Sequence, residues 1–173
     1  MKRNLILTFC LILLLALPDI TLASRPTQIT FVLDGKTTYP GVPTEHGSVL
    51  RFTGLEAEGN ITGDLVGAFH YIENVTANLA TLWGTNQGFM TMTITEGCRG
   101  GDGAGTIDIR FEGRTQIDLD SWVAIVADQP FTILKGTEGC EGIHGHGTRN
   151  ARVSLIVPSF TVTYTAEVHW DPQ

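Results

Sequence analysis

Alternation of apolar and polar side chains is the feature that most constrains what this chain can fold into. Ile107, Ile109 and Phe111 are separated by polar or charged residues, and the same alternation recurs from Ile29 to Trp170. Successive side chains of a β-strand point to opposite faces, so each such segment has one apolar and one polar face. No stretch after residue 24 repeats apolar residues at helical spacing. The chain is therefore expected to be all-β.

Eight segments carry this alternation and define the expected strands. They are residues 27–33, 47–56, 61–72, 79–96 with a break near 84–88, 104–116, 121–134 with a bend at 128–130, 143–157 and 160–170. Short turns containing Gly or Asp separate them, among them residues 118–121. A single eight-stranded antiparallel up-and-down β-barrel is the expected fold, because closure removes exposed edge strands. A two-sheet β-sandwich is the alternative.

Residues 1–23 have the composition of a cleavable signal peptide. Two basic residues precede an apolar run that ends at Pro18, and Thr21 and Ala23 place small residues where signal peptidase reads the chain. The apolar run is too short for a transmembrane helix. We predict cleavage after Ala23 and one β-barrel domain at residues 24–173. The protein is expected to be secreted or extracellular, or periplasmic in a Gram-negative bacterium.

Charge restricts the partners of this chain. Acidic residues outnumber basic residues by 18 to 11, and the formal net charge is −7. This balance repels nucleic acid and anionic lipid surfaces. A small hydrophobic ligand is the expected partner, no cofactor is indicated, and the sequence does not determine the oligomeric state.

A Gly-rich segment occurs twice, at residues 95–106 and 137–148, and each copy leads into a long alternating strand. Both copies begin Thr-Glu-Gly-Cys, so Cys98 and Cys140 occupy equivalent positions. Glycines at such places permit bulges and close backbone approach.

The repeat predicts a disulfide between Cys98 and Cys140. In the expected barrel the two cysteine loops lie at the same end, two strands apart, which is about 9.6 Å at sheet spacing. A disulfide needs Cα atoms within about 7 Å, so the loops must lean together over the rim, and their glycines permit this. A pair of cysteines in an oxidising compartment favours a disulfide over catalysis or metal binding.

The second copy also resembles a family motif. Residues 136–148 are similar to the Gly-Thr-Gly-x-[Phe/Leu]-x-Gly-x-x-Gly-x-Gly segment of allene oxide cyclase-like and dirigent-like barrels, a segment shared by uncharacterised bacterial members. Residues 63–69 and the strand ending at Trp170 are similar to the same families. Glu138 and Cys140 depart from the motif, which has glycine and a bulky apolar residue there.

This resemblance implies an eight-stranded barrel with a central cavity. In the plant members it implies folding or positioning of a hydrophobic intermediate. The pocket acids of those members match no position of this sequence, so the resemblance contributes no catalytic residue.

His144 and His146 lie two residues apart, a spacing that places two imidazoles on one face of a strand, within reach of one metal ion. Alternation opposes a buried metal site: Val153, Leu155 and Val157 are expected to point inward, which leaves these histidines facing water. His70 and His169 fall on the polar faces of their own strands. We therefore predict no metal site.

The inward faces of the expected strands supply the candidate ligand-binding residues. The candidates for lining a cavity are Phe31, Phe69, Tyr71, Met92, Phe111 and Tyr164. Glu73 and Arg149 fall at the same alternate positions (the same parity) as the inward residues of their strands, and they are predicted as polar groups near the barrel mouth. Most other acids fall on outer faces, so no catalytic residue is predicted. Asn60 and Asn74 begin glycosylation sequons, which only a eukaryotic secretory pathway would use.

Two functions from different classes fit these features. The favoured one is a secreted, non-enzymatic barrel that binds a small hydrophobic molecule or is packed shut. The alternative is an allene oxide cyclase-like or dirigent-like catalyst that guides a hydrophobic intermediate by cavity shape and a few polar groups. An open interior with two or more ionisable groups favours catalysis, and a dry or filled interior favours the first function.

Overall fold

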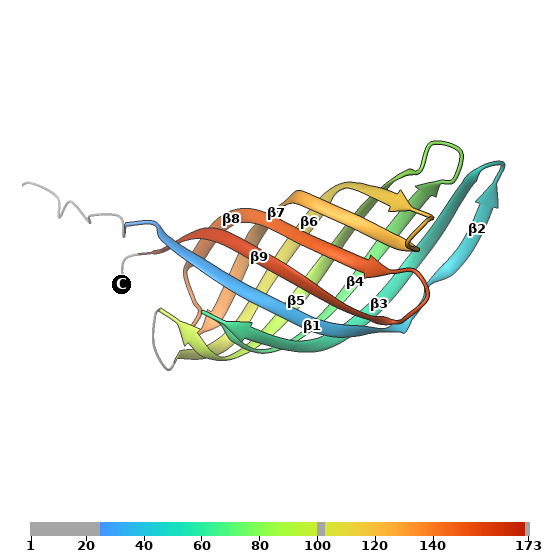
Figure 1. Cartoon of the computed structure of the whole chain (residues 1–173). Coiled ribbons are helices and arrows are strands. Elements are labelled where there is room, and N and C mark those ends of the chain that lie inside the picture. Colours follow the sequence, from blue (N-terminus) through green and yellow to red (C-terminus); the bar gives the residue numbers. More distant parts are fainter. Residues whose placement is uncertain (1–24, 100–102, 172–173) are drawn as a thin grey trace, which may run out of the picture.

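The computed structural model describes residues 25–99 and 103–171, and its regular elements are all β-strands (Figure 1). The strands are β1 (Thr27–Tyr39), β2 (Val42–His46), β3 (Val49–Gly63), β4 (Val66–Asn78), β5 (Trp83–Cys98), β6 (Gly103–Asp118), β7 (Val123–Glu138), β8 (Ile143–Ser154) and β9 (Ser159–Trp170). The predicted signal peptide lies outside the described residues, and so does its cleavage site. In the described part of the chain, no helix has the length and apolarity needed to cross a membrane.

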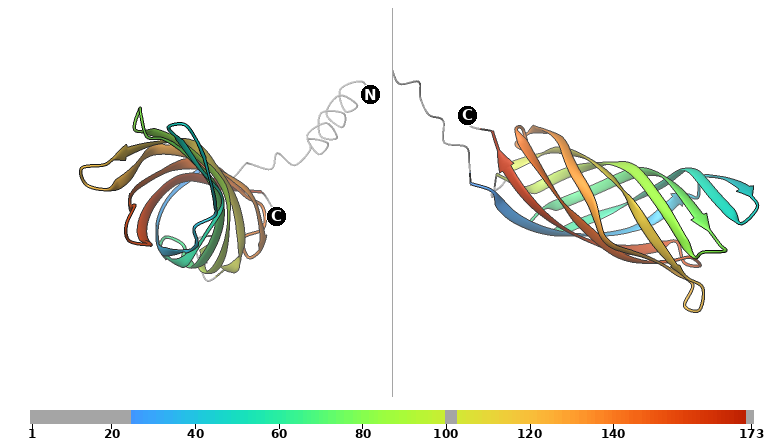
Figure 2. Two further views of the ribbon diagram at one scale, coloured as in Figure 1. Left: turned by 90° about the vertical axis from the view of Figure 1, so that its right-hand side faces the viewer. Right: turned by 90° about the horizontal axis from the view of Figure 1, so that it is seen from above.

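Eight of the strands close into an antiparallel barrel. The sheet order is β1-β9-β8-β7-β6-β5-β4-β3-β2, and an additional pairing of β1 with β3 closes the ring. The view along the barrel shows the strands enclosing this ring (Figure 2). The predicted barrel is confirmed and the sandwich is excluded. Strand β2 was not predicted; it extends the sheet beyond β3, past the part of β3 that pairs with β1.

The two ends of the barrel differ in how their turns are built. The hairpin end holds the turns at residues 47–48, 79–82, 119–122 and 155–158, and the disulfide end holds those at 64–65 and 139–142 together with Cys98 (Figure 1). The start of β1 and the end of β9 also lie at the disulfide end.

Alternate residues of the barrel strands point inward and form one apolar core. All six predicted lining residues are buried in it, from 0% exposure at Tyr164 to 7% at Tyr71. Their rings pack together: Phe31 stacks on Tyr164 with centroids 5.0 Å apart, and Tyr71 meets the edge of Phe111 at 5.9 Å. These contacts fill much of the barrel cross-section with side chains.

The expected boundary between the second and third strands is wrong. The sequence predicted a turn between residues 56 and 61, whereas β3 runs unbroken to Gly63 and the turn is Asp64-Leu65. Gly59 suggested that turn, but it lies inside the strand because β1 passes close by. A Cβ at Gly59 would stand 2.6 Å from the Cα of Gly35. This glycine therefore serves close approach of two strands rather than chain reversal.

The inward placement of Leu155 and Val157 is also wrong. Strand β8 ends at Ser154, and residues 155–158 form the turn to β9, where Leu155 is 49% exposed and Val157 52% exposed. The serine hydroxyl accepts hydrogen bonds from the amides of Ile156 and Val157, which closes the turn. The alternation continued past the strand end because the turn itself consists of apolar residues.

Of the two irregularities expected within strands, one is absent and the other is present. The expected break at residues 84–88 does not occur, because β4 and β5 pair in continuous register from Gly67 to Asn78. The expected bend near residue 128 does occur. The β7–β8 register shifts between Val126 and Gln129, and Asp128 has φ 47°. A bulge of this kind bends a strand and changes which side chains face inward.

The disulfide predicted from the repeat joins Cys98 to Cys140, with Cα atoms 5.0 Å apart. It crosses the start of β6, because Cys98 is the last residue of β5 and Cys140 lies in the turn after β7. A Cβ at Gly105 would lie 3.1 Å from the sulfur of Cys140, so a side chain there would crowd the bridge. The glycine repeat thus gives the disulfide room to span the intervening strand.

Candidate functional site

A polar cluster lies inside the barrel among the aromatic rings. Glu73 on β4 and Arg149 on β8 both point inward, with only 9% and 4% of their surfaces exposed. The guanidinium Nη2 of Arg149 is 3.9 Å from the carboxylate Oε2 of Glu73. The two residues that parity assigned to the barrel mouth therefore form a buried charge pair.

Arg149 has partners on three further strands. Its Nε donates to Oε1 of Gln129 on β7, and its Nη1 donates to the hydroxyl of Tyr164 on β9 at 3.3 Å. The guanidinium also lies over the ring of Phe111 on β6, 3.6 Å from the ring centroid. A cation over an aromatic face is attracted by the ring quadrupole, and the attraction is strongest where water is excluded.

Asn86 on β5 connects the two sides of the cluster. Its Nδ2 donates to Oε2 of Glu73 at 3.1 Å, and its Oδ1 accepts from Nε2 of Gln129 and from the hydroxyl of Thr115. In the described part of the chain, every buried side-chain nitrogen or oxygen has a hydrogen-bond partner. The cluster is therefore internally satisfied, as a buried polar network must be to avoid a large desolvation cost.

Local irregularities of the strands place these side chains. Gln129 pairs with Arg149 directly after the β7 bulge, which turns the glutamine inward. The β6–β7 register shifts between Phe111 and Gln116, close to Thr115. Bulges often re-aim side chains next to functional sites.

Burial controls the protonation of the cluster. It raises the pKa of Glu73 above the ordinary 4.5, and the opposing effects of Arg149 and Asn86 do not cancel this shift. Burial also raises the pKa of Tyr164, and it raises the pKa of Tyr71 well above its ordinary value, with a further rise from the charge of Glu73. The tyrosines remain protonated donors, and Glu73 holds a proton to higher pH than an exposed glutamate would.

The histidines lie outside the barrel interior. His70, His146 and His169 are exposed, while His144 is half-buried, has its Nε2 3.1 Å from Oδ2 of Asp171, and stacks on the ring of His169. No group of three or more metal-binding side chains gathers in residues 25–99 and 103–171.

The outer acids make local pairs. Arg110 pairs with Glu112 at 2.8 Å, and Asp108 pairs with Lys135 at 3.2 Å. The sequon residues Asn60 and Asn74 are both exposed, and their glycosylation stays a prediction.

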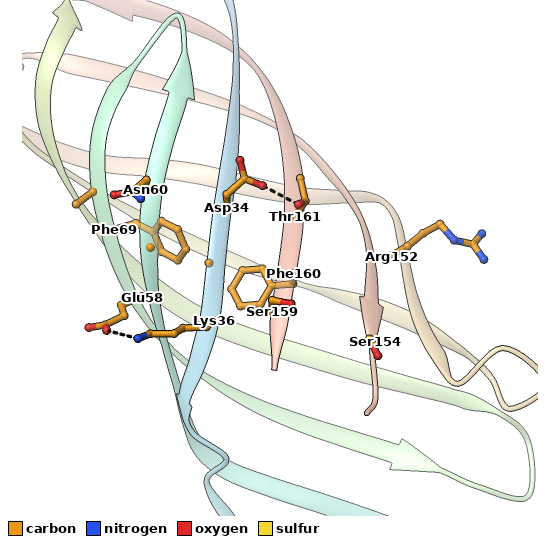
Figure 3. Close-up of a pocket in the computed structure, with 13 residues that line it drawn as sticks. Asp34, Lys36, Glu58, Asn60, Phe69, Arg152, Ser154, Ser159, Phe160 and Thr161 are labelled. Atoms are coloured by element: carbon orange, nitrogen blue, oxygen red, sulfur yellow. Dashed lines mark hydrogen bonds and ion pairs between the residues drawn. The ribbon is translucent and has the colours of Figure 1, made fainter. Parts of the chain in front are cut away.

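A second hollow lies on the outer face, across β3, β1 and β9 (Figure 3). It measures about 880 Å³. Four of its polar side chains pair with one another: Thr161 donates to Asp34 at 2.7 Å, and Lys36 is 3.7 Å from Glu58. In Figure 3 the Arg152 side chain extends away from these residues. The interior cluster is therefore the stronger candidate site, because it combines charge, donors and aromatic rings.

Sequence reasoning missed Asn86, Thr115 and Gln129. Asn86 shares parity with the inward Met90 and Met92, and this signal was masked by the break expected at residues 84–88. Gln129 could not be assigned a face, because the bulge beside it reverses the local parity.

Comparisons with known proteins place the fold but not the function. No protein-family model matches the chain, and no curated protein matches its sequence. A solved structure of a protein of unknown function from the DUF3224 family of Shewanella oneidensis is similar with a TM-score of 0.58 and 10% identity, over 86% of this chain and 100% of that one.

Two pterocarpan synthase dirigent proteins are also similar. GePTS1 has a TM-score of 0.46 and 13% identity over 88% of this chain and 89% of its own, and PsPTS1 has 0.45 and 14% over 88% and 99%. The closed barrel is the fold that the resemblance of the glycine motif implied, and the DUF3224 structure, at 10% identity, supports that fold alone. The likeness to allene oxide cyclases stays a prediction.

Proposed function

We propose that this protein is a secreted barrel that binds a small, largely apolar molecule carrying one oxygen-containing polar group, held at the Glu73–Arg149 cluster. The observation that carries the proposal is a charge pair buried among aromatic rings. Replacing a buried ion pair with well-packed apolar side chains is often neutral or stabilising. A barrel that served only to be packed shut would gain nothing from keeping the pair.

The cluster has the groups needed to recognise such a ligand. Arg149 and Tyr164 can donate hydrogen bonds to a carbonyl or hydroxyl oxygen, while Glu73 can accept from a hydroxyl. Phe111 and Tyr71 supply apolar ring surface beside them. The apolar part of such a ligand would take over contacts that the aromatic rings now make with one another. Its oxygen would take over hydrogen bonds that the side chains now make, so the polar group would not be left unpaired.

The position of the cluster favours access from the hairpin end. Asn86 is three residues from the first residue of β5, and Thr115 is three residues from the last residue of β6. Both of those strand ends belong to the hairpin end.

Ligand capture tests the proposal. Native mass spectrometry of the protein purified without denaturation is expected to show a bound species of small mass, and Prodan, a naphthalene probe with one ketone oxygen, should bind saturably with an increase in fluorescence. Arg149→Met should raise the Kd of that probe at least tenfold, whereas the matched exposed variant Arg152→Met should leave it unchanged. Absence of both a copurified species and saturable probe binding would overturn the proposal.

A second candidate function rests on the raised pKa of Glu73. A carboxyl group that retains its proton can act as a general acid toward a bound substrate, with Arg149 stabilising developing negative charge. These polar groups would serve the dirigent-like or cyclase-like catalyst that is the alternative function. The copurified species, incubated with fresh protein and followed by mass spectrometry, should then be converted to an isomer or a product. Glu73→Gln should abolish conversion while retaining binding, and unchanged turnover in that variant would exclude this role.

A further inference from the structure

A groove on the outer face of β3 to β6 shares Asn86 with the interior cluster, and its other lining residues belong to neither site described above. One part measures about 540 Å³ and a neighbouring part about 460 Å³. The two parts share Thr76, Thr85 and Arg114, so they form one continuous surface near the hairpin end.

Strand register arranges the floor of the groove in regular rows. One row runs Arg51, Thr76, Thr85, Arg114 across the four strands. The next row places Asn74, Gln87 and Glu112 side by side, and Trp83 lies on the hairpin side of Thr85. Alternate residues of a strand share a face, so these side chains project together from the outside of the barrel.

The two arginines of the groove are not neutralised by neighbours. Arg51 and Arg114 are both exposed, and within the described residues neither makes an ion pair or a side-chain hydrogen bond. Glu112 is the acid that lines the groove, and it is paired with Arg110 at 2.8 Å. The arginines stand three strands apart, about 14 Å at sheet spacing, so they can contact two separate anionic groups of one extended ligand.

The remaining groups suit a hydroxyl-rich ring. Asn74 accepts from the amide of Gly54 through Oδ1, which leaves its Nδ2 as a donor toward the groove. Gln87, Thr76 and Thr85 add hydroxyl and amide groups in the same plane. Trp83 is 49% exposed, and a half-exposed indole offers a flat apolar surface beside polar groups.

We propose that this groove binds an anionic polysaccharide, with sugar rings against Trp83 and the amides, and carboxylates on Arg51 and Arg114. Arginine forks match the geometry of a carboxylate. Nucleic acid is a less suitable ligand, because it needs a broad basic surface rather than two arginines. The groove lies outside the barrel, so the proposal is independent of ligand binding in the interior.

Affinity electrophoresis tests the proposal with protein made in a bacterial host, where the Asn74 sequon is not glycosylated. Polygalacturonate in the gel is expected to retard the protein, while neutral dextran and polyglutamate should not. The apparent Kd for polygalacturonate should rise at least tenfold in the double variant Arg51→Gln/Arg114→Gln, and severalfold in Trp83→Ala. The matched variant Lys36→Gln/Arg152→Gln removes the same charge from another face and should behave like the wild type.

Three outcomes would overturn the proposal: no retardation by polygalacturonate, equal retardation by polyglutamate, or equal loss in the matched variant. All substituted side chains are exposed, so far-ultraviolet circular dichroism should show an unchanged barrel. If Trp83→Ala alone disturbs the fold, the arginine pair still decides the result.

Discussion

The loops at the two ends of the barrel are held by different interactions. At the disulfide end, a covalent bond links two loops across an intervening strand, and both cysteines are buried, with exposures of 1% and 0%. At the hairpin end, three of the four turns are held by a polar side chain at the end of the preceding strand. Asn78, Asp118 and Ser154 each accept hydrogen bonds from amides two and three residues ahead.

The interior follows the same division. Ile107 and Ile143, near the disulfide end, belong to a wholly apolar part of the core, whereas the Glu73–Arg149 cluster lies toward the hairpin end. The difference teaches that the covalent bond and the buried polar cluster lie toward opposite ends of one barrel.

Removing the disulfide should cause the largest loss of unfolding free energy, and it tests the difference between the two ends. The variant Cys98→Ala/Cys140→Ala is expected to lose about 4 kcal/mol of unfolding free energy, because the bridge restricts the unfolded chain across a long loop. Urea unfolding followed by tryptophan fluorescence measures it. A loss below about 1 kcal/mol would mean that the loops are held by other contacts.

Arg149→Met, in the cluster toward the hairpin end, should cause the next largest loss of unfolding free energy. Removing the guanidinium leaves Glu73 buried without its charge partner, which is expected to cost about 3 kcal/mol. The double variant Glu73→Gln/Arg149→Met should recover much of that loss, since neither charge then remains. The same unfolding experiment applied to both variants checks this, and additive losses would show that the pair is not coupled.

Glu73→Gln should change how stability depends on pH. The folded-state pKa of Glu73 is raised above 4.5, so the unfolded chain releases this proton first as pH rises. The wild type should therefore lose stability relative to Glu73→Gln as pH rises from the unfolded pKa through the folded pKa. Unfolding free energies at several pH values between about 4 and about 8 measure the difference, which parallel curves would contradict.

Leu155→Ser should have the smallest effect. The side chain is 49% exposed in the turn after β8, so the change in unfolding free energy should stay within about 0.5 kcal/mol. Ile109→Ser, on a residue with 0% exposure, is the contrasting variant and should be severely destabilised. Equal losses would mean that the apolar turn is buried in solution, for example against a partner.

Part of the candidate site could be predicted from parity alone. Glu73 and Arg149 alternate in step with buried neighbours, and Tyr71, Phe111 and Tyr164 do so too. Gln129 could not be found in this way, because Asp128 adopts a left-handed conformation and shifts the register beside it. The contact between Glu73 and Arg149 was also beyond reach, since it depends on how the barrel closes.

The sequence by itself determined the elements whose causes are local: the strand faces, the turn at Asp118 and the equivalent positions of the two cysteines. These depend on alternation, on a side chain bonding its own turn and on a repeat, all of which lie within short stretches of chain. Only the tertiary structure decided that Gly59 lies inside a strand, that Leu155 lies outside the core and that a charge pair is held among aromatic rings. Those features depend on which strands approach one another, and that is set by the free energy of packing the whole barrel rather than by any one segment.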